Sequence, residues 1–145
     1  INKFKAKEAK KNLERQNSRV KIKTFHEELV PTNSFLLDSD VVIDSTNDIN
    51  TSLIIDKNCK KPLLVCRYAG DSGIVFNKTA TINVKKLQAK LEKDKKIEDI
   101  GIFNPTVCLA ASILVSESMK ILLKKKPIKG LISFNSWNHT IRVKK

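Results

Sequence analysis

The chain has 145 residues, of which 41% are hydrophobic and 30% are charged. This length and apolar fraction are typical of one folded domain with a hydrophobic core, and they exclude an intrinsically disordered chain. The small numbers of glycine (4) and proline (4) exclude collagen-like and low-complexity sequences. We therefore expect residues 1–145 to form a single domain.

The formal net charge of +13 raises the question of nucleic-acid binding, because positive charge increases the affinity of a protein for phosphate polymers. The basic residues are spread along the whole chain, however, and nearly all of them are lysines. Aromatic residues, on which bases stack, make up only 6% of the chain. Arginine, which contacts phosphates and bases in a bidentate manner, occurs only at Arg15, Arg19, Arg67 and Arg142. We expect a solvated, lysine-rich surface rather than a nucleic-acid interface.

The cysteines Cys59, Cys66 and Cys108 lie in apolar segments, and no pair has C-x-x-C spacing. This pattern favours reduced thiols in a cytoplasmic protein over a disulfide framework or a zinc site. The longest apolar stretch, Val107–Leu123, is interrupted by polar and charged residues. It therefore indicates a buried amphipathic helix rather than a membrane span.

In chain order, the hydrophobic pattern predicts helices that alternate with strands. Lys5–Gln16 has apolar residues at helical spacing, whereas Val20–Phe25 alternates as a strand does. The turn Pro31–Asn33 opens a short helix over Phe35–Leu37, and the β-branched run Val41–Ile43 is typical of a strand buried on both faces. The further predicted elements are a helix over Ile49–Cys59, a strand over Pro62–Tyr68, a turn between Gly70 and Gly73 into Ile74–Phe76, a polar helix over Val84–Lys96, a long helix over Thr106–Lys124, and a hairpin of Leu131–Phe134 and Thr140–Val143.

This alternation predicts an α/β fold with a mostly parallel, helix-covered sheet, followed by a long helix and a C-terminal hairpin. Ligands of such sheets bind beyond the carboxyl ends of the strands. In this chain that place is the polar loop Asp44–Asp48, which directly follows a predicted strand.

The segment around this loop resembles the ThiF/HesA/MoeB family, the adenylyltransferases related to ubiquitin-activating enzymes. Asp40–Asp48 is similar to the family pattern D-hydrophobic-V-hydrophobic-D-A/C-T-D-N, and Pro62 and Gly73 follow at the family spacing. Pro105–Leu122 is similar to the family's proline-led apolar helix, which ends in E-A-hydrophobic-K-hydrophobic-L. A third similarity lies near the N-terminus. Lys3–Ala6 resembles the family pattern G-x-x-K-A/V before a helix, and Arg15–Asn17 resembles the R-x-N that follows it.

The resemblance implies a Rossmann-like nucleotide-binding fold, of which this chain is the C-terminal part. The implied activity is the ATP-dependent adenylation of the C-terminal carboxylate of a ubiquitin-like sulfur-carrier protein, with ATP and Mg²⁺ as cofactors. No zinc is expected, because the paired C-x-x-C motifs of the zinc-bearing members are missing. The family's glycine-rich phosphate loop is also missing, and we expect it upstream of Ile1. The implied partner is therefore a second copy, in a homodimer, or the N-terminal half of the fold.

By the same resemblance, Lys5, Asp44 and Asn47 are candidate nucleotide-binding residues. Lys5 is either a phosphate contact or one more solvated lysine, and Asp44 either binds a ligand or satisfies nearby donors. Asn47 stands where the family has a magnesium-binding acidic residue, and Asp48 is a candidate metal ligand in its place. The alternative is that Asn47 and Asp48 only cap the next helix. Cys66 is expected to be a buried, inert thiol rather than a nucleophile.

Two functions remain open at this point. The chain is either a segment of an active adenylyltransferase, or a non-catalytic, protein-binding or regulatory member of the same fold. Lys5 and the intact motif spacing favour the first. The second is favoured by Asn47, by Ser52 at the position of a family arginine, and by the lack of a cysteine in Phe76–Ile102, where thioester-forming members carry one.

Overall fold

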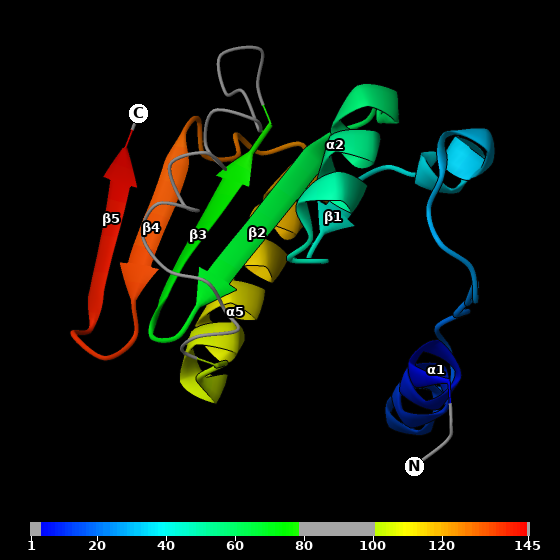
Figure 1. Ribbon diagram of the computed structural model, residues 1–145, viewed down its shortest axis with the longest axis horizontal. Coiled ribbons are helices and arrows are strands. Elements are labelled where there is room, and N and C mark those ends of the chain that lie inside the picture. Colours follow the sequence, from blue (N-terminus) through cyan, green and yellow to red (C-terminus); the bar gives the residue numbers. More distant parts are fainter. Residues whose placement is uncertain (1–3, 79–100, 145) are drawn as a thin grey trace.

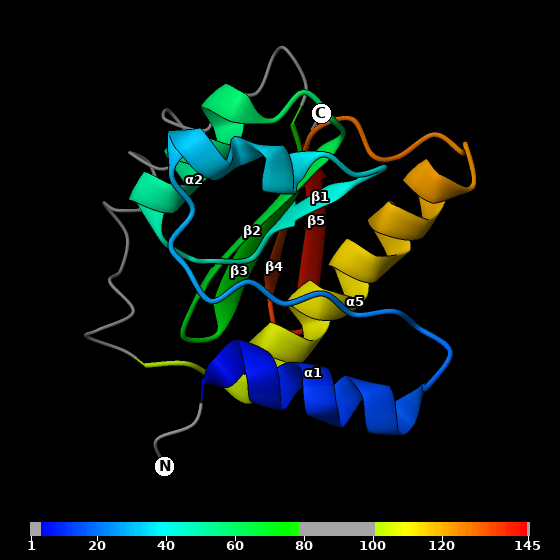
Figure 2. The same ribbon diagram turned by 90° about the vertical axis from the view of Figure 1, so that its right-hand side faces the viewer.

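The computed structural model describes residues 4–78 and 101–144, which contain one five-stranded sheet. The strands lie side by side in the order in which they occur along the chain (Figure 1). Seen along the sheet, α5 (Asn104–Leu122) covers one face, and α2 (Ile49–Asn58) with the short 3-10 helix η1 (Pro31–Leu37) covers the other (Figure 2). The strands are β1 (Val42–Asp44), β2 (Leu63–Ala69), β3 (Ser72–Asn77), β4 (Leu131–Asn135) and β5 (Thr140–Lys144).

The described helices agree closely with those predicted from the apolar periodicity. They are α1 (Lys5–Gln16), η1 (Pro31–Leu37), α2 (Ile49–Asn58) and α5 (Asn104–Leu122). The bounds of α1 are those predicted, and α5 is unbroken, with its proline in the first turn, where the missing N–H is harmless. The predicted helix Val84–Lys96 lies outside the described residues.

The sheet confirms the α/β fold class, but its described strands are mixed rather than mostly parallel. Only β1 and β2 pair in parallel, and every other neighbouring pair is antiparallel. The reason is the length of the connections: α2 provides the helical crossover that a parallel pair needs, whereas β2–β3 and β4–β5 are joined by tight hairpins. The predicted C-terminal hairpin is confirmed.

Two strand predictions are wrong in detail. The segment Val20–Phe25 forms no strand, and Val20 and Phe25 are both 51% exposed. Its alternating residues lie on the connection between α1 and η1, where no neighbouring strand among the described residues pairs with it (Figure 2). The run Val41–Ile43 is not buried on both faces, because β1 is a sheet edge among the described strands and Ile43 is 44% exposed.

The core forms two layers, one on each face of β2 and β3. Alternate residues of β2 face opposite sides, so Leu63 and Val65 pack toward α2, whereas Leu64 and Cys66 pack toward α5. Both faces of the central strands are thus covered, which explains their nearly continuous apolar sequence. Both layers continue through the next strand and a helix, with Ile55 of α2 in the first and Ala110 of α5 in the second.

Helix α5 is long and apolar enough to cross a membrane by length and composition alone, and it is the only described helix of that kind. In the structure, one of its faces packs on the sheet through Ala110 and Leu114, and it also buries Glu117. The Oε2 atom of Glu117 accepts a hydrogen bond from the backbone N–H of Ile128 at 2.7 Å, and the other oxygen pairs with Lys120. Glu117 therefore ties α5 to the segment that connects it to β4.

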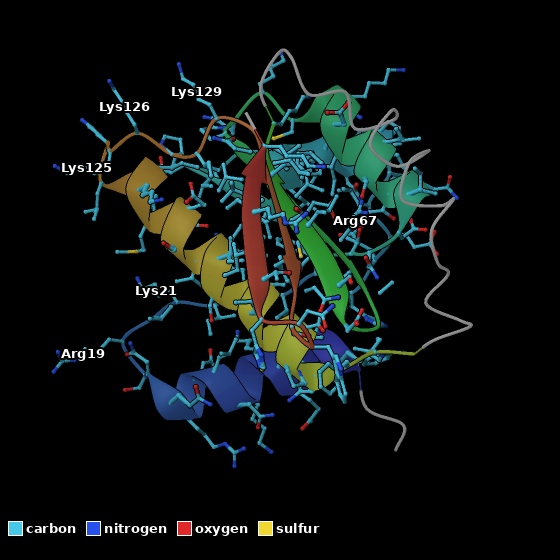
Figure 3. All side chains as sticks on the ribbon, turned by 90° about the vertical axis from the view of Figure 1, so that its left-hand side faces the viewer. Arg19, Lys21, Arg67, Lys125, Lys126 and Lys129 are labelled. Atoms are coloured by element: carbon cyan, nitrogen blue, oxygen red, sulfur yellow. The ribbon has the colours of Figure 1, made fainter. Side chains whose placement is uncertain are left out.

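Basic side chains of two segments are exposed to solvent, as expected for a solvated, lysine-rich surface. Figure 3 shows the labelled basic residues of two exposed segments pointing outward, away from the sheet. These are Arg19 and Lys21, which follow α1, and Lys125, Lys126 and Lys129, which follow α5. Arg67, by contrast, lies on the sheet, with only 11% of its side chain exposed.

We predict that Gly73→Ala destabilises the fold, because a Cβ atom at this position would overlap the ring of Phe134 and lie 3.1 Å from the carbonyl oxygen of Arg67. The expected loss is about 1–3 kcal/mol in the free energy of unfolding, as for other overpacked cores. Urea titration followed by circular dichroism measures it. In a Phe134→Leu background the ring atoms are absent, so the loss caused by Gly73→Ala should shrink. An equal loss in both backgrounds would contradict this origin.

Candidate functional site

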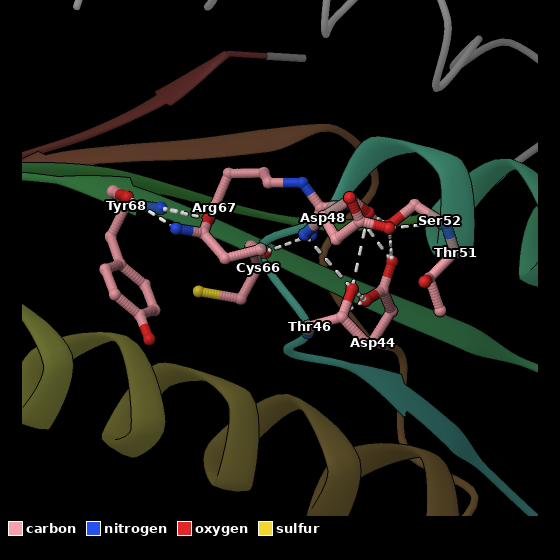
Figure 4. A network of polar contacts seen from close by, with 9 residues as sticks. Asp44, Thr46, Asp48, Thr51, Ser52, Cys66, Arg67 and Tyr68 are labelled. Carbon is pink, nitrogen blue, oxygen red and sulfur yellow. Dashed lines mark hydrogen bonds and ion pairs between the residues drawn. The ribbon is translucent and has the colours of Figure 1, made fainter. Parts of the chain in front are cut away.

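The candidate site is the loop that follows β1, at the carboxyl end of the parallel pair. Asp44, the last residue of β1, is 1% exposed, and both of its carboxylate oxygens are engaged (Figure 4). Its Oδ1 atom accepts hydrogen bonds from the backbone N–H of Thr46 at 3.1 Å and from the Thr46 hydroxyl at 2.7 Å. Its Oδ2 atom accepts a hydrogen bond from the Ser52 hydroxyl and forms an ion pair with Arg67 at 3.2 Å.

Arg67 reaches this loop from β2, on the face of the sheet that carries α2. Besides Asp44, its Nη2 atom contacts the Ser52 hydroxyl and donates to the carbonyl oxygen of Asp48 at 3.4 Å. Its Nη1 atom donates to the carbonyl oxygen of Cys66 at 2.7 Å. The guanidinium thus joins β1, the loop, α2 and β2 into one polar network.

Asn47 fastens the middle of the loop to the end of β2. Its side-chain amide donates to the carbonyl oxygen of Tyr68 at 3.0 Å and accepts from the N–H of the same residue at 3.2 Å. Its backbone has φ of 56°, in the left-handed region, which asparagine adopts more readily than most residues. The residue therefore satisfies two backbone groups of β2 and also allows the loop to turn.

Asp48 caps α2, which is the second of the two roles considered for it from the sequence. Its Oδ2 atom accepts a hydrogen bond from the backbone N–H of Thr51 at 2.7 Å. The hydrogen bonds from Thr51 hold the pKa of Asp48 below its usual value, and the charge of Arg67 lowers that pKa further.

The contacts of Asp44 and Asn47 do not fit a bound magnesium ion, whereas the role of Asp48 as a metal ligand stays a prediction. Magnesium binds through carboxylate oxygens, waters and phosphate groups. The oxygens of Asp44 are held by Thr46, Ser52 and the cationic Arg67, and the amide of Asn47 is held by Tyr68. Within the described ranges, no group of three or more His, Cys, Asp or Glu residues could hold a metal ion.

Lys5 is not brought together with the other three candidate residues. It is exposed in the first turn of α1, a helix that buries none of its residues and stands apart from the sheet (Figures 1 and 2). The described polar contacts of the Asp44–Asp48 loop come from β1, α2 and β2. The role of Lys5 as a phosphate contact therefore stays a prediction.

Sequence reasoning missed Arg67 as a member of the site. The available signal was its position, since it is the one charged residue in the apolar strand Pro62–Tyr68. Its neighbour Cys66 was correctly predicted to be buried: it is 1% exposed, and its burial raises the pKa of the thiol to about 12. A thiol with that pKa is protonated at neutral pH and is not a nucleophile.

The model of the ThiF family matches residues 1–145. The chain belongs to the ThiF family. No curated protein sequence matches it. Solved structures with the same fold include E. coli MccB in complex with ATP, at 15% identity and a TM-score of 0.74, where the match covers 99% of this chain and 48% of MccB. They also include selenomethionine PaaA, at 17% identity and a TM-score of 0.69, with 100% of this chain and 56% of PaaA covered. The ThiF-family chain thus spans about half the length of these proteins.

We predict that Asn47→Asp destabilises the protein at neutral pH. The substitution removes the N–H donor and turns a carboxylate oxygen toward the carbonyl oxygen of Tyr68, which now lies 3.0 Å from the Asn47 amide nitrogen. The expected loss is about 1–3 kcal/mol in the free energy of unfolding. Repulsion raises the pKa of the new carboxyl in the folded state, and its protonated form regains a donor. The loss should therefore shrink as the pH falls through this raised pKa, and it should be gone below about pH 4, the ordinary pKa of an aspartate in the unfolded chain.

Thermal unfolding between neutral and acidic pH tests this prediction, with Asn50→Asp as the matched control. Asn50 is exposed in the first turn of α2, where a carboxylate is favourable because of the helix dipole. We expect no loss of stability in the control. Equal stability of the two variants at neutral pH would contradict the pairing of Asn47 with Tyr68.

Proposed function

We propose that this chain forms part of an ATP-dependent adenylyltransferase that activates the C-terminal carboxylate of a ubiquitin-like sulfur-carrier protein. The observation that carries the proposal is the ThiF-family match over all 145 residues. The position of the Asp44–Asp48 loop supports it, because the loop follows β1 at the edge of the sheet where α/β proteins bind their ligands.

The structural neighbours support the presence of two ligands in this fold. MccB was solved with AMPCPP and MccA together, at a TM-score of 0.73 to this chain. By analogy, ATP and a partner that supplies a carboxylate would bind to the protein that carries this chain. The sulfur carrier as that partner rests on the family resemblance.

In the proposed reaction, an oxygen of the carrier's C-terminal carboxylate attacks the α-phosphorus of ATP. The bond from this phosphorus to the oxygen that bridges to the β-phosphate breaks, and pyrophosphate leaves with that bridging oxygen. The product is an acyl-adenylate. Lys5 is the proposed phosphate contact of this chain, acting as a point charge. The contacts of Asp44 and Asn47 do not fit magnesium, so we assign the metal no step.

A non-catalytic, protein-binding role is the second candidate, and one observation favours it. Arg67 neutralises Asp44, and both oxygens of that carboxylate are hydrogen-bonded within the chain. A site built in this way stabilises the fold without a ligand. It could serve a member of the family that binds a protein partner and performs no adenylation.

ATP–pyrophosphate exchange decides between the two functions. The assay uses the full protein that carries these residues, together with a ubiquitin-like carrier. For an adenylyltransferase we expect exchange that depends on the carrier and that falls about tenfold or more in Lys5→Ala, because a charged phosphate contact is lost. Lys11→Ala is the matched control, since Lys11 is another exposed lysine of α1. No exchange by the folded protein would favour the non-catalytic role.

We also propose that the chain associates through α5, with a second copy or with an N-terminal half of the fold. Val115, Met119 and Leu122 on this helix are 59%, 48% and 50% exposed, and exposed apolar patches mark association surfaces. Sedimentation velocity at micromolar concentration should show a species heavier than the monomer, and Val115→Glu with Met119→Glu should weaken it. Ser116→Glu, also exposed on α5, is the control. A wild-type chain that stays a compact monomer, both alone and mixed with an N-terminal half of the fold, would contradict the proposal.

A further inference from the structure

The buried charge of Asp44 needs a counter-charge, because a carboxylate removed from water is stable only when it is paired and hydrogen-bonded. Asp44 is 1% exposed, and the cation beside it is the guanidinium of Arg67, whose side chain is 11% exposed. The pair lies in the described core between β1, β2 and α2, and three further donors complete the bonding of the carboxylate: the Thr46 N–H, the Thr46 hydroxyl and the Ser52 hydroxyl.

The set of atoms around Arg67 resembles the ligand set of a small hard cation. Three oxygens of different origin converge on its Nη2 atom: a carboxylate oxygen of Asp44, the hydroxyl oxygen of Ser52 and the backbone carbonyl oxygen of Asp48. Carboxylate, hydroxyl and carbonyl oxygens are also what a divalent cation binds. The guanidinium nitrogen and a metal ion therefore compete for one position.

We infer that Arg67 is the permanent cation of this site, and that the carboxylate of Asp44 binds no divalent cation while Arg67 is present. A metal ion on Asp44 would lie beside a guanidinium of the same sign in surroundings that contain little water, where the repulsion between like charges is strong. Arg67 also reaches the site from β2, so its charge is held in place by the strand pairing of the sheet. The inference rests on these contacts and does not depend on the proposed adenylation.

Mn²⁺ is the probe for this inference, because its paramagnetism reports binding directly through electron paramagnetic resonance of the free ion. The protein is the full chain, and no nucleotide is added. In the wild type we expect no saturable Mn²⁺ site, and Asp44→Asn should give the same titration as the wild type. Saturable binding by the wild type that Asp44→Asn abolishes would overturn the inference.

Removal of the arginine should create the site. Arg67→Met leaves the oxygens of Asp44, Ser52 and Asp48 facing an unfilled position, so we expect saturable Mn²⁺ binding at least about tenfold tighter than in Arg67→Lys, which keeps the positive charge. Excess Mg²⁺ should then raise the melting temperature of Arg67→Met, but not that of the wild type at equal ionic strength. A folded Arg67→Met that binds Mn²⁺ no better than Arg67→Lys would overturn the inference. If Arg67→Met does not fold, the wild type and Asp44→Asn decide the question alone.

Discussion

The buried carboxylate of Asp44 is the group that joins β1, α2 and β2. Water cannot solvate it at 1% exposure, so each of its hydrogen bonds has to come from the protein. The donors come from three different segments: Thr46 in the loop, Ser52 in α2 and Arg67 in β2. Removal of one donor leaves a buried charge with less compensation, which is costly. The positions of these three segments are therefore set together rather than one by one.

The strand register explains why Arg67 can reach this carboxylate. Asp44 pairs with Val65 in the parallel ladder, and Arg67 follows two residues later, so its side chain lies on the same face of the sheet. Strand β1 ends at Asp44, whereas β2 continues to Ala69. Strand β2 thus extends past the end of β1, and its residues Arg67 and Tyr68 lie beside the Asp44–Asp48 loop. Tyr68, the next residue, offers its backbone to Asn47.

The sequence predicts the elements whose pattern lies within one segment. It does not predict the features that depend on which strands pair with each other. The sequence predicts helix α1 because its apolar residues recur at helical spacing, and it predicts strand β2 because Pro62–Tyr68 is a short, almost unbroken apolar run. Val20–Phe25 also has a strand period, but a strand requires a neighbour to pair with, and the pattern of one segment contains no information about that neighbour. The same holds for the site, because Asp44 and Arg67 are 23 positions apart and only the register of β1 on β2 brings them together.

Membership of the ThiF family determines the fold of this chain. Which cation lies beside Asp44 depends instead on a few residues at the site. The match to MccB has a TM-score of 0.74 at only 15% identity, so the fold depends on the pattern of buried residues more than on their identity. Leu64 and Val75, which are fully buried, lie in the middle of the sheet, whereas Asn47 and Arg67 lie at the carboxyl end of its parallel strand pair. The cation of the site can thus be an arginine within the same fold, so the chemistry of the site follows from its own residues rather than from the fold.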